Sequence, residues 1–242
     1  MKALILAAGR GKRLDEVSLG INKCMLKVQG KYIIAHSLDC VATLPEIEQV
    51  IIVVGYHAQD IMREFGSLYR GKNISYVRQQ EQQGLVDAIE CARVEVGASD
   101  FMLMLGDELM LNPHHPEFIK EFLGTGVFAL CGTVKVSDTN LIKKTYAVIQ
   151  NEDRRIFRLI EKPNYFFNNL MGTGNCLFKN KIFDYIAKTP INQKRHEKEL
   201  PDLIQCAIDE GEIVRTFSIC EEYINVNSEE ELRKANSYFA HL

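Results

Sequence analysis

The chain has 242 residues, of which 46% are hydrophobic and 25% charged, and its formal net charge is −3. This length supports a full hydrophobic core, and the composition is that of an ordinary globular protein rather than a disordered chain. The slight negative charge argues against general nucleic-acid binding, and no apolar stretch approaches membrane-spanning length, so we expect neither a nucleic-acid nor a membrane partner.

Seven cysteines lie far apart, and no two of them form a C-x-x-C pair. Their odd number and wide spacing fit neither a zinc site nor a disulfide framework, which favours a reducing, cytoplasmic location. The first residues pass directly into an apolar run, so we also expect no signal peptide.

That apolar run, residues 3–7, predicts a buried first strand, and it is followed closely by Gly9 and Gly11. Glycines let the backbone turn sharply and approach a ligand without a Cβ in the way. Three cations flank them: Arg10, Lys12 and Arg13. Exposed N–H groups beside cations form a cradle for anionic oxygens, so this turn predicts a phosphate site.

Two familiar phosphate loops do not fit this turn. A dinucleotide-binding G-x-G-x-x-G turn needs a third glycine where Leu14 stands, and a Walker loop needs Ser or Thr after Gly11-Lys12, where Arg13 stands. A basic surface turn without a ligand remains the structural alternative.

Strands and helices alternate through the rest of the first half. Strands are predicted at residues 50–54, 74–77 and 101–105, and helices around 33–41, at 58–65 and around 85–92. Continuous apolar strands separated by helices indicate a parallel sheet covered on both faces. Ligands of such sheets bind beyond the carboxyl ends of the strands, where Gly9, Gly55, Gln79 and Asp107 all fall.

The second half predicts mixed strands. They are expected at residues 127–136, 146–149, 156–160, 172–178 and 213–219, with a further segment at 223–226. Residues 151–153 would turn a hairpin, and helices are expected near 181–186, around 200–209 and from 228. His114 and His115, between two prolines, are assigned to a loop and not to the site. We therefore predict one α/β domain over 1–242, with a Rossmann-like, mixed but mainly parallel sheet and helices on both faces.

Five segments carry recognisable motifs. They are LAAGRGKRL at 6–14, NKCML at 22–26, QQEQQGLVDA at 79–88, LGD at 105–107 and EKP at 161–163. Together they resemble the sugar-phosphate nucleotidylyltransferases, a family that includes glucose-1-phosphate thymidylyl- and uridylyltransferases and related cytidylyltransferases. Asn22 stands where that family usually has proline.

The resemblance implies a reaction in which a phosphate oxygen of an acceptor attacks the α-phosphorus of a nucleoside triphosphate and expels pyrophosphate, with Mg²⁺ as cofactor. It implies a nucleotide-binding half, 1–112, and an acceptor-binding half, 113–242. By resemblance, the triphosphate and base are held by Leu6, Ala7, Ala8, Gly9, Gly11, Gln79 and Gly84. The implied catalytic cations are Arg13, Lys23 and Lys162. Asp107 is the implied metal ligand.

The acceptor and second metal positions depart from the family pattern. The resemblance places Ala147, Glu161, Lys162, Gly174 and Asn175 around the acceptor, and Ala147 replaces the usual glycine. Near the C-terminal strand, where the family has an acid, the chain has Asn225 and Asn227. Either asparagine could complete the metal site, with Asn227 slightly favoured, because amide oxygens can ligate Mg²⁺ without charge. Alternatively, these asparagines only prepare a helix cap at Ser228.

Three alternatives stay open at this point. A cytidylyltransferase for a small phosphorylated or phosphonate compound would also suit the altered acceptor segment. A catalytically silent sugar-nucleotide sensor could share the fold, since folds can keep binding and lose turnover. An NAD-linked oxidoreductase is disfavoured by Leu14. The sequence leaves a homo-oligomer open.

Overall fold

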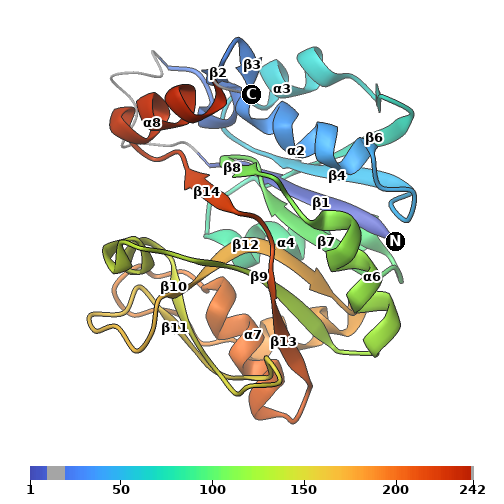
Figure 1. The fold of residues 1–242 in the computed structure, drawn as a ribbon. Helices are drawn as coiled ribbons and strands as arrows, with labels where there is room; N and C mark the ends of the chain where they lie inside the picture. The colour runs from blue at the N-terminus through green and yellow to red at the C-terminus, as the bar shows by residue number, and fades with distance from the viewer. Residues whose placement is uncertain (10–19, 241–242) are drawn as a thin grey trace.

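Residues 1–9 and 20–240 are described by the computed structural model of the chain, whose fold is drawn in Figure 1. The strands of the first half are β1 (Lys2–Ala7), β2 (Lys27–Val28), β3 (Lys31–Tyr32), β4 (Gln49–Val54), β5 (Leu68–Tyr69), β6 (Lys72–Arg78), β7 (Phe101–Leu105) and β8 (Glu108–Leu111). Those of the second half are β9 (Ala129–Lys135), β10 (Tyr146–Gln150), β11 (Ile156–Glu161), β12 (Leu170–Phe178), β13 (Val214–Ser218) and β14 (Glu222–Asn225).

The helices follow the same alternation. The α-helices are α2 (Ile33–Ala42), α3 (Ala58–Phe65), α4 (Leu85–Cys91), α5 (Arg93–Val96), α6 (His115–Thr125), α7 (Leu200–Asp209) and α8 (Glu229–Phe239). The 3₁₀ segments are η2 (Lys23–Met25), η3 (Thr139–Lys144) and η4 (Asn180–Lys188).

A central sheet runs through both halves in the order β11-β10-β12-β7-β1-β4-β6-β5, with β9 paired to β12 and β13 to β9. The first-half core is parallel, since β1 pairs in register with both β4 and β7, and β4 pairs with β6. The second half joins it antiparallel through β12 and β7, and β10–β11 is the expected hairpin. The predicted mixed, mainly parallel α/β fold is confirmed.

Alternate residues of the buried strands face opposite layers, as the two-residue period of a strand requires. Leu4, Ile51 and Leu103 face the layer that contains α4 and α7, whereas Ile5, Ile52 and Met104 face the layer that contains α2, α3 and α6. Figure 1 shows the sheet between these helices. Burial on both faces explains why these strands are continuously apolar.

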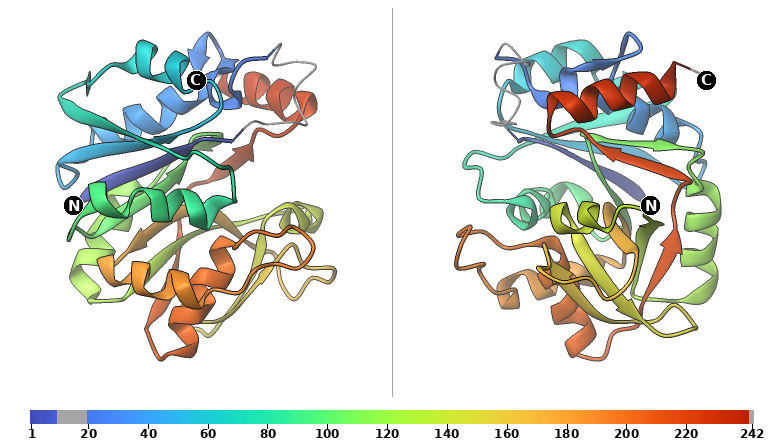
Figure 2. Two further views of the ribbon diagram at one scale, coloured as in Figure 1. Left: turned by 180° about the vertical axis from the view of Figure 1, so that it is seen from behind. Right: turned by 60° about the vertical axis from the view of Figure 1, so that its left-hand side comes forward.

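A second, small sheet joins the C-terminal part of the chain to its middle. β14 pairs antiparallel with β8, and Asn225 lies opposite Glu108. The final helix, α8, then packs over β2 through a cluster that includes Val28, Ile224 and Ala235. Figure 2 shows this last helix, in red, beside the blue segments from the start of the chain.

Several elements were not predicted from the sequence, among them the short strands β2, β3, β5 and β8 and the helix α6. Two assignments also differ from the structure. His115, assigned to a loop, begins α6; its side chain is buried and its Nε2 lies 2.9 Å from Asn175 Oδ1. Pro116 does not prevent the helix, because the first turn needs no backbone donor at that position. The helix expected near 181–186 is the 3₁₀ segment η4.

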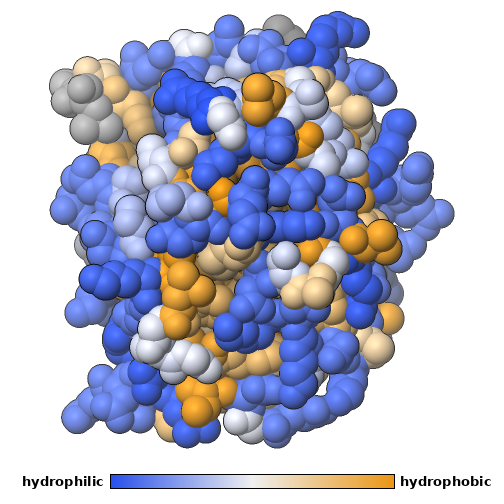
Figure 3. All heavy atoms as spheres, turned by 90° about the vertical axis from the view of Figure 1, so that its right-hand side faces the viewer, coloured by the Kyte–Doolittle hydropathy of each residue, from blue (hydrophilic) through white to orange (hydrophobic). Residues whose placement is uncertain are grey.

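The face on the right of Figure 1 is largely hydrophilic, and its hydrophobic atoms lie in small separate groups (Figure 3). Among the residues described, no helix is long and apolar enough to cross a membrane.

Candidate active site

The end of β1 forms one wall of the first cavity. The strand leads into Ala8 and Gly9, and a Cβ on Gly9 would have no atom of the described residues within 4 Å. Gly55 is different, because its Cβ would lie 2.8 Å from the Ala8 carbonyl oxygen. The chain after β4 therefore packs directly against the turn. Gly11 and Arg13, together with Arg10 and Lys12, lie outside the described residues.

The first cavity, of about 340 Å³, contains most of the predicted nucleotide residues. Its lining includes Leu6, Ala7, Ala8, Gly9, Gln79, Gly84, Lys23 and Asp107. Gln79 Nε2 donates to Gly84 O at 3.0 Å and to Asp87 Oδ2 at 2.7 Å, which fixes the amide at the cavity wall. Gln82, which the sequence analysis did not select, also lines the cavity and donates to Ala8 O at 2.9 Å.

Asn22 explains how the chain positions Lys23 without the family's proline. Its buried side chain donates to Ala7 O at 3.0 Å and to Tyr56 O at 2.8 Å, and it accepts from the Cys24 N–H at 2.9 Å. These three bonds tie the start of η2 to the ends of β1 and β4. These hydrogen bonds of the Asn22 side chain hold the backbone before Lys23 in place, a role that a rigid proline ring would otherwise have.

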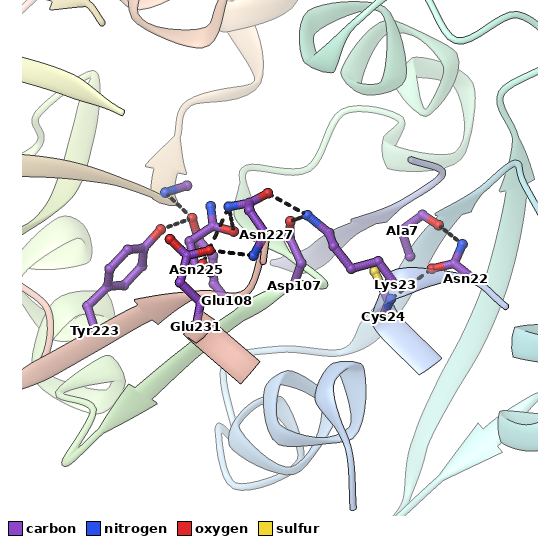
Figure 4. A network of polar contacts seen from close by, with 11 residues as sticks. Ala7, Asn22, Lys23, Cys24, Asp107, Glu108, Tyr223, Asn225, Asn227 and Glu231 are labelled. Atoms are coloured by element: carbon purple, nitrogen blue, oxygen red, sulfur yellow. Dashed lines mark hydrogen bonds and ion pairs between the residues drawn. The ribbon is translucent and has the colours of Figure 1, made fainter. Parts of the chain in front are cut away.

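Lys23, Asp107, Asn227 and Asn225 form a connected polar chain (Figure 4). The Lys23 ammonium pairs with the Asp107 carboxylate and donates to Asn227 Oδ1 at 2.9 Å. Asn227 Nδ2 in turn donates to Asn225 Oδ1 at 2.7 Å. The β8–β14 ladder produces this convergence, because it pairs Asn225 with Glu108, and just beyond it the Val226 N–H donates to Asp107 O at 3.0 Å.

This donor set fits a hard divalent cation that keeps other ligands. It offers one carboxylate and two amide oxygens, and among the described residues no group of three or more His, Cys, Asp or Glu side chains could hold a metal alone. Mg²⁺ commonly binds through one or two carboxylates plus substrate phosphates. The Lys23 ammonium between Asp107 and Asn227 shows that positive charge is favoured at this point. The predicted metal residues thus lie together and fit Mg²⁺.

A second cavity, of about 210 Å³, lies between β12 and the segment before α7. Glu161, Lys162 and Gly174 line it, as predicted for an acceptor site. Ala147 instead packs into a small core cluster with Met171. The Asn175 side chain is fully buried. The structure therefore does not bring the side chains of Ala147 and Asn175 to the cavity with the other three.

An irregularity in β12 shapes this second cavity. Pairing with β9 shifts between Gly172 and Cys176, which frees the Gly174 N–H to donate to Glu108 Oε1 at 2.9 Å. A Cβ on Gly174 would lie 2.3 Å from Leu105 Cγ, and one on Gly172 would lie 1.9 Å from the Tyr146 ring. Bulges commonly redirect side chains beside active sites. Here the bulge turns Asn175 inward, where its Nδ2 donates to Glu108 Oε2 at 2.8 Å.

Arg195 is the main functional candidate that the sequence analysis missed. It lines both cavities and pairs with Glu161 at 3.3 Å, with Glu199 at 2.9 Å and with Glu197. It lies between η4 and α7 and belongs to no motif, so only the tertiary fold reveals it. Burial, followed by the charge of Glu161, raises the pKa of Glu199 to about 7.

Glu108 lines the second cavity as well. Only 4% of the residue is exposed, and burial raises the pKa of its carboxyl to about 7, against opposing hydrogen bonds from Tyr223, Gly174 and Asn175. The cavity wall therefore includes a deeply desolvated acid beside the metal residue Asp107.

With this geometry in place, the comparisons with known proteins are decisive. The chain matches the family model "Nucleotidyl transferase" over residues 2–222. It belongs to the nucleotidyl transferase family. As a member of this family it is an enzyme of the transferase class, which confirms the resemblance seen in the motifs.

The relatives of this nucleotidyl transferase act on sugar phosphates by name. It is 31% identical to the UTP–glucose-1-phosphate uridylyltransferase AglF of Haloferax volcanii, over 90% of this chain and 88% of that enzyme. It is 30% identical to a glucose-1-phosphate thymidylyltransferase of Streptomyces griseus, over 90% of this chain but 60% of that enzyme. A UDP-glucose pyrophosphorylase structure with UDP-glucose shares the fold, with a TM-score of 0.86 and 22% identity over 99% of this chain and 98% of that one.

Proposed function

We propose that this nucleotidyl transferase joins a nucleoside monophosphate unit from a nucleoside triphosphate to a sugar 1-phosphate or a closely related phosphorylated acceptor. The observation that carries the proposal is the meeting of two cavities, which share Leu85, Leu105, Arg195 and Glu197 in their walls. One cavity contains Lys23 and the other Lys162. Two anionic substrates bound there would have their phosphates between these cations. The names of the relatives support a glucose 1-phosphate type of acceptor.

In the proposed reaction, an acceptor phosphate oxygen attacks the α-phosphorus while the bond from that phosphorus to the bridging oxygen breaks and pyrophosphate leaves. Phosphoryl-type transfer needs positioning and charge stabilisation more than covalent help from the protein. Lys23 would neutralise charge that grows on the α-phosphate, and Arg13 would hold the departing phosphates. Lys162 would offset the repulsion between the two anions.

The proposal divides the chain by role. Residues 1–112 would bind the nucleotide and 113–242 the acceptor, with Gln79 and Gly84 beside the base. Arg195 is an addition from the second half that reaches both cavities.

Mg²⁺ is the proposed cofactor, held by Asp107 with Asn227 and Asn225. When bound, it would supply Lewis-acid charge to the triphosphate oxygens. The backbone N–H of Asn227 donates a hydrogen bond to Glu231 Oε2 at 2.7 Å. Helix α8, which contains Glu231, therefore helps to hold this amide ligand in place.

A pyrophosphate-release assay tests the proposal directly. Each of UTP, dTTP, CTP, ATP and GTP is combined with a panel of sugar 1-phosphates and small phosphorylated acceptors, with Mg²⁺ or with excess chelator. We expect pyrophosphate only when an acceptor, a triphosphate and Mg²⁺ are all present. Binding of a nucleotide sugar without any pyrophosphate release would favour the silent sensor instead.

A further inference from the structure

Glu108 stands apart from the other acids of the acceptor cavity. Glu161, Glu197 and Glu199 all pair with Arg195, and Glu161 also pairs with Lys162 at 2.8 Å. The Glu108 carboxylate accepts hydrogen bonds from Gly174, Asn175 and Tyr223, but among the described residues no cation pairs with it. A carboxylate buried without a cation is costly, so its place in a substrate cavity calls for an explanation.

The balance of charges around the whole cavity also favours a positive group on the acceptor. Its lining contains four carboxylates and three cations, and one of these cations, Lys144, is paired at 2.7 Å with Glu231, which is not part of this lining. A phosphorylated acceptor adds further negative charge. If Lys162 and Arg195 turn toward its phosphate, the carboxylates are left with fewer partners. A positive group elsewhere on the acceptor would restore the balance.

We infer that Glu108 determines acceptor specificity by pairing with an ammonium group, so that the acceptor is a phosphorylated amine, such as an amino-sugar 1-phosphate. This inference rests on the proposed function and names the substrate class of the same site. A carboxylate can accept at both oxygens from several donors, so the three existing bonds orient Glu108 and leave acceptor capacity for the ligand. Gly174 lets the carboxylate come close, since a Cβ there would lie 2.8 Å from Glu108 Oε1.

The test compares matched acceptors that differ only at one group. The panel contains glucose 1-phosphate, its 2-, 3- and 4-amino-deoxy counterparts, and the N-acetyl form of each amine, whose charge is lost. kcat/KM is measured for the purified full chain with its best triphosphate and Mg²⁺. We expect at least one free amine to exceed both its hydroxyl and N-acetyl counterparts by about tenfold to a hundredfold, which is the usual range for a hydrogen bond to a charged group.

Two variants separate charge recognition from a structural role. Glu108→Gln keeps the size of the side chain but removes its charge, and should reduce the amine-to-hydroxyl ratio to about one through the acceptor KM, while the triphosphate KM is unchanged. Tyr223→Phe removes one hydrogen bond to the same carboxylate and keeps the charge, so the ratio should persist.

The outcomes are distinct. No preference for any amine in the wild-type enzyme, or a preference that survives Glu108→Gln, would overturn the inference while pyrophosphate release still supported the proposed function. Equal loss of preference in both variants would assign Glu108 a structural role and overturn it as well. Absence of pyrophosphate release with every acceptor would overturn the proposed function together with this inference.

Discussion

The two cavities of this enzyme differ in the residues that line them. The first cavity, proposed to bind the nucleotide, combines the small residues Ala7, Ala8 and Gly9 at the end of β1 with the polar side chains of Lys23, Gln79 and Asp107. The acceptor cavity is formed by charged side chains that pair with one another around Arg195, beside a bulged strand packed tightly at Gly172 and Gly174. Backbone N–H groups suit a ligand common to a whole family, whereas side chains can change with the acceptor.

This contrast suggests that the first cavity performs the chemistry common to the family, and that the acceptor cavity determines which acceptor is used. Substitutions of Lys23 and Asp107 in the first cavity should affect catalysis most, because the proposed reaction develops its transition-state charge beside them. Those inside the acceptor cavity should affect one substrate or the stability of the fold.

The largest effect is expected for Asp107→Asn in the first cavity. Removing the one carboxylate of the proposed metal site should lower kcat by about a thousandfold, since metal charge stabilisation is worth several kcal/mol. Steady-state pyrophosphate release with increasing Mg²⁺ measures this. Asp153→Asn, in an exposed turn, is the matched control. Activity near the wild-type level in the Asp107 variant would remove that residue from the site.

Lys23→Ala should lower kcat by about a hundredfold or more, with little change in the triphosphate KM, because its charge matters most in the transition state. The exposed Lys27, on β2, supplies the control Lys27→Ala. If the Lys23 variant changes KM alone, the lysine contributes only to binding.

Two glycine substitutions test the difference in packing. Gly172→Ala should lower the free energy of unfolding by about 1–3 kcal/mol, because its Cβ would overlap the buried Tyr146 ring. Gly9→Ala should leave that free energy almost unchanged, because its Cβ would overlap no atom of residues 1–9 and 20–240. Urea denaturation followed by circular dichroism compares them. Equal stability of both variants would contradict the packing described for β12.

Lys162→Ala should raise the acceptor KM by about tenfold and spare the triphosphate, as expected for one charge-assisted contact to phosphate. Kinetics with each substrate varied in turn show the division. Lys120→Ala, on the exposed face of α6, controls for loss of a surface charge. A similar rise in both KM values would mean that the cavities do not bind their substrates separately.

The smallest effect concerns Glu199 and pH. Its folded-state pKa is raised from 4.5 to about 7, so the stability linked to its protonated form is present below pH 4.5 and is lost as the pH rises through 7. Glu199→Gln removes this loss, and the stability of the variant relative to wild type should increase between pH 4.5 and 8 by about 1–3 kcal/mol. Thermal unfolding across this range measures it. A pH-independent difference would show that Glu199 does not titrate there.

The sequence was informative where structure depends on local pattern. The parallel strands and their terminal residues were predicted well, because each is a continuous apolar run followed by a turn. The β8–β14 ladder was missed, because its partners lie far apart in the chain (Tyr223 and Glu108 are 115 residues apart) and short strands carry little pattern. Arg195 was missed for the same reason, because its partners are set by long-range folding. Asn175 was expected at the acceptor, but the bulge in β12 turns its side chain inward.

The β8–β14 ladder also sets the order in which the enzyme becomes active during its synthesis. Domains fold as the chain leaves the ribosome, N-terminal segments first. The central strands and Asp107 emerge well before β14 and α8, which bring Asn225 and Asn227 and hold them through Glu231. A nascent chain can therefore form its central strands while the proposed metal site is still incomplete. We expect activity to begin only when the last helix docks, so prematurely terminated chains that lack it should form no nucleotide product.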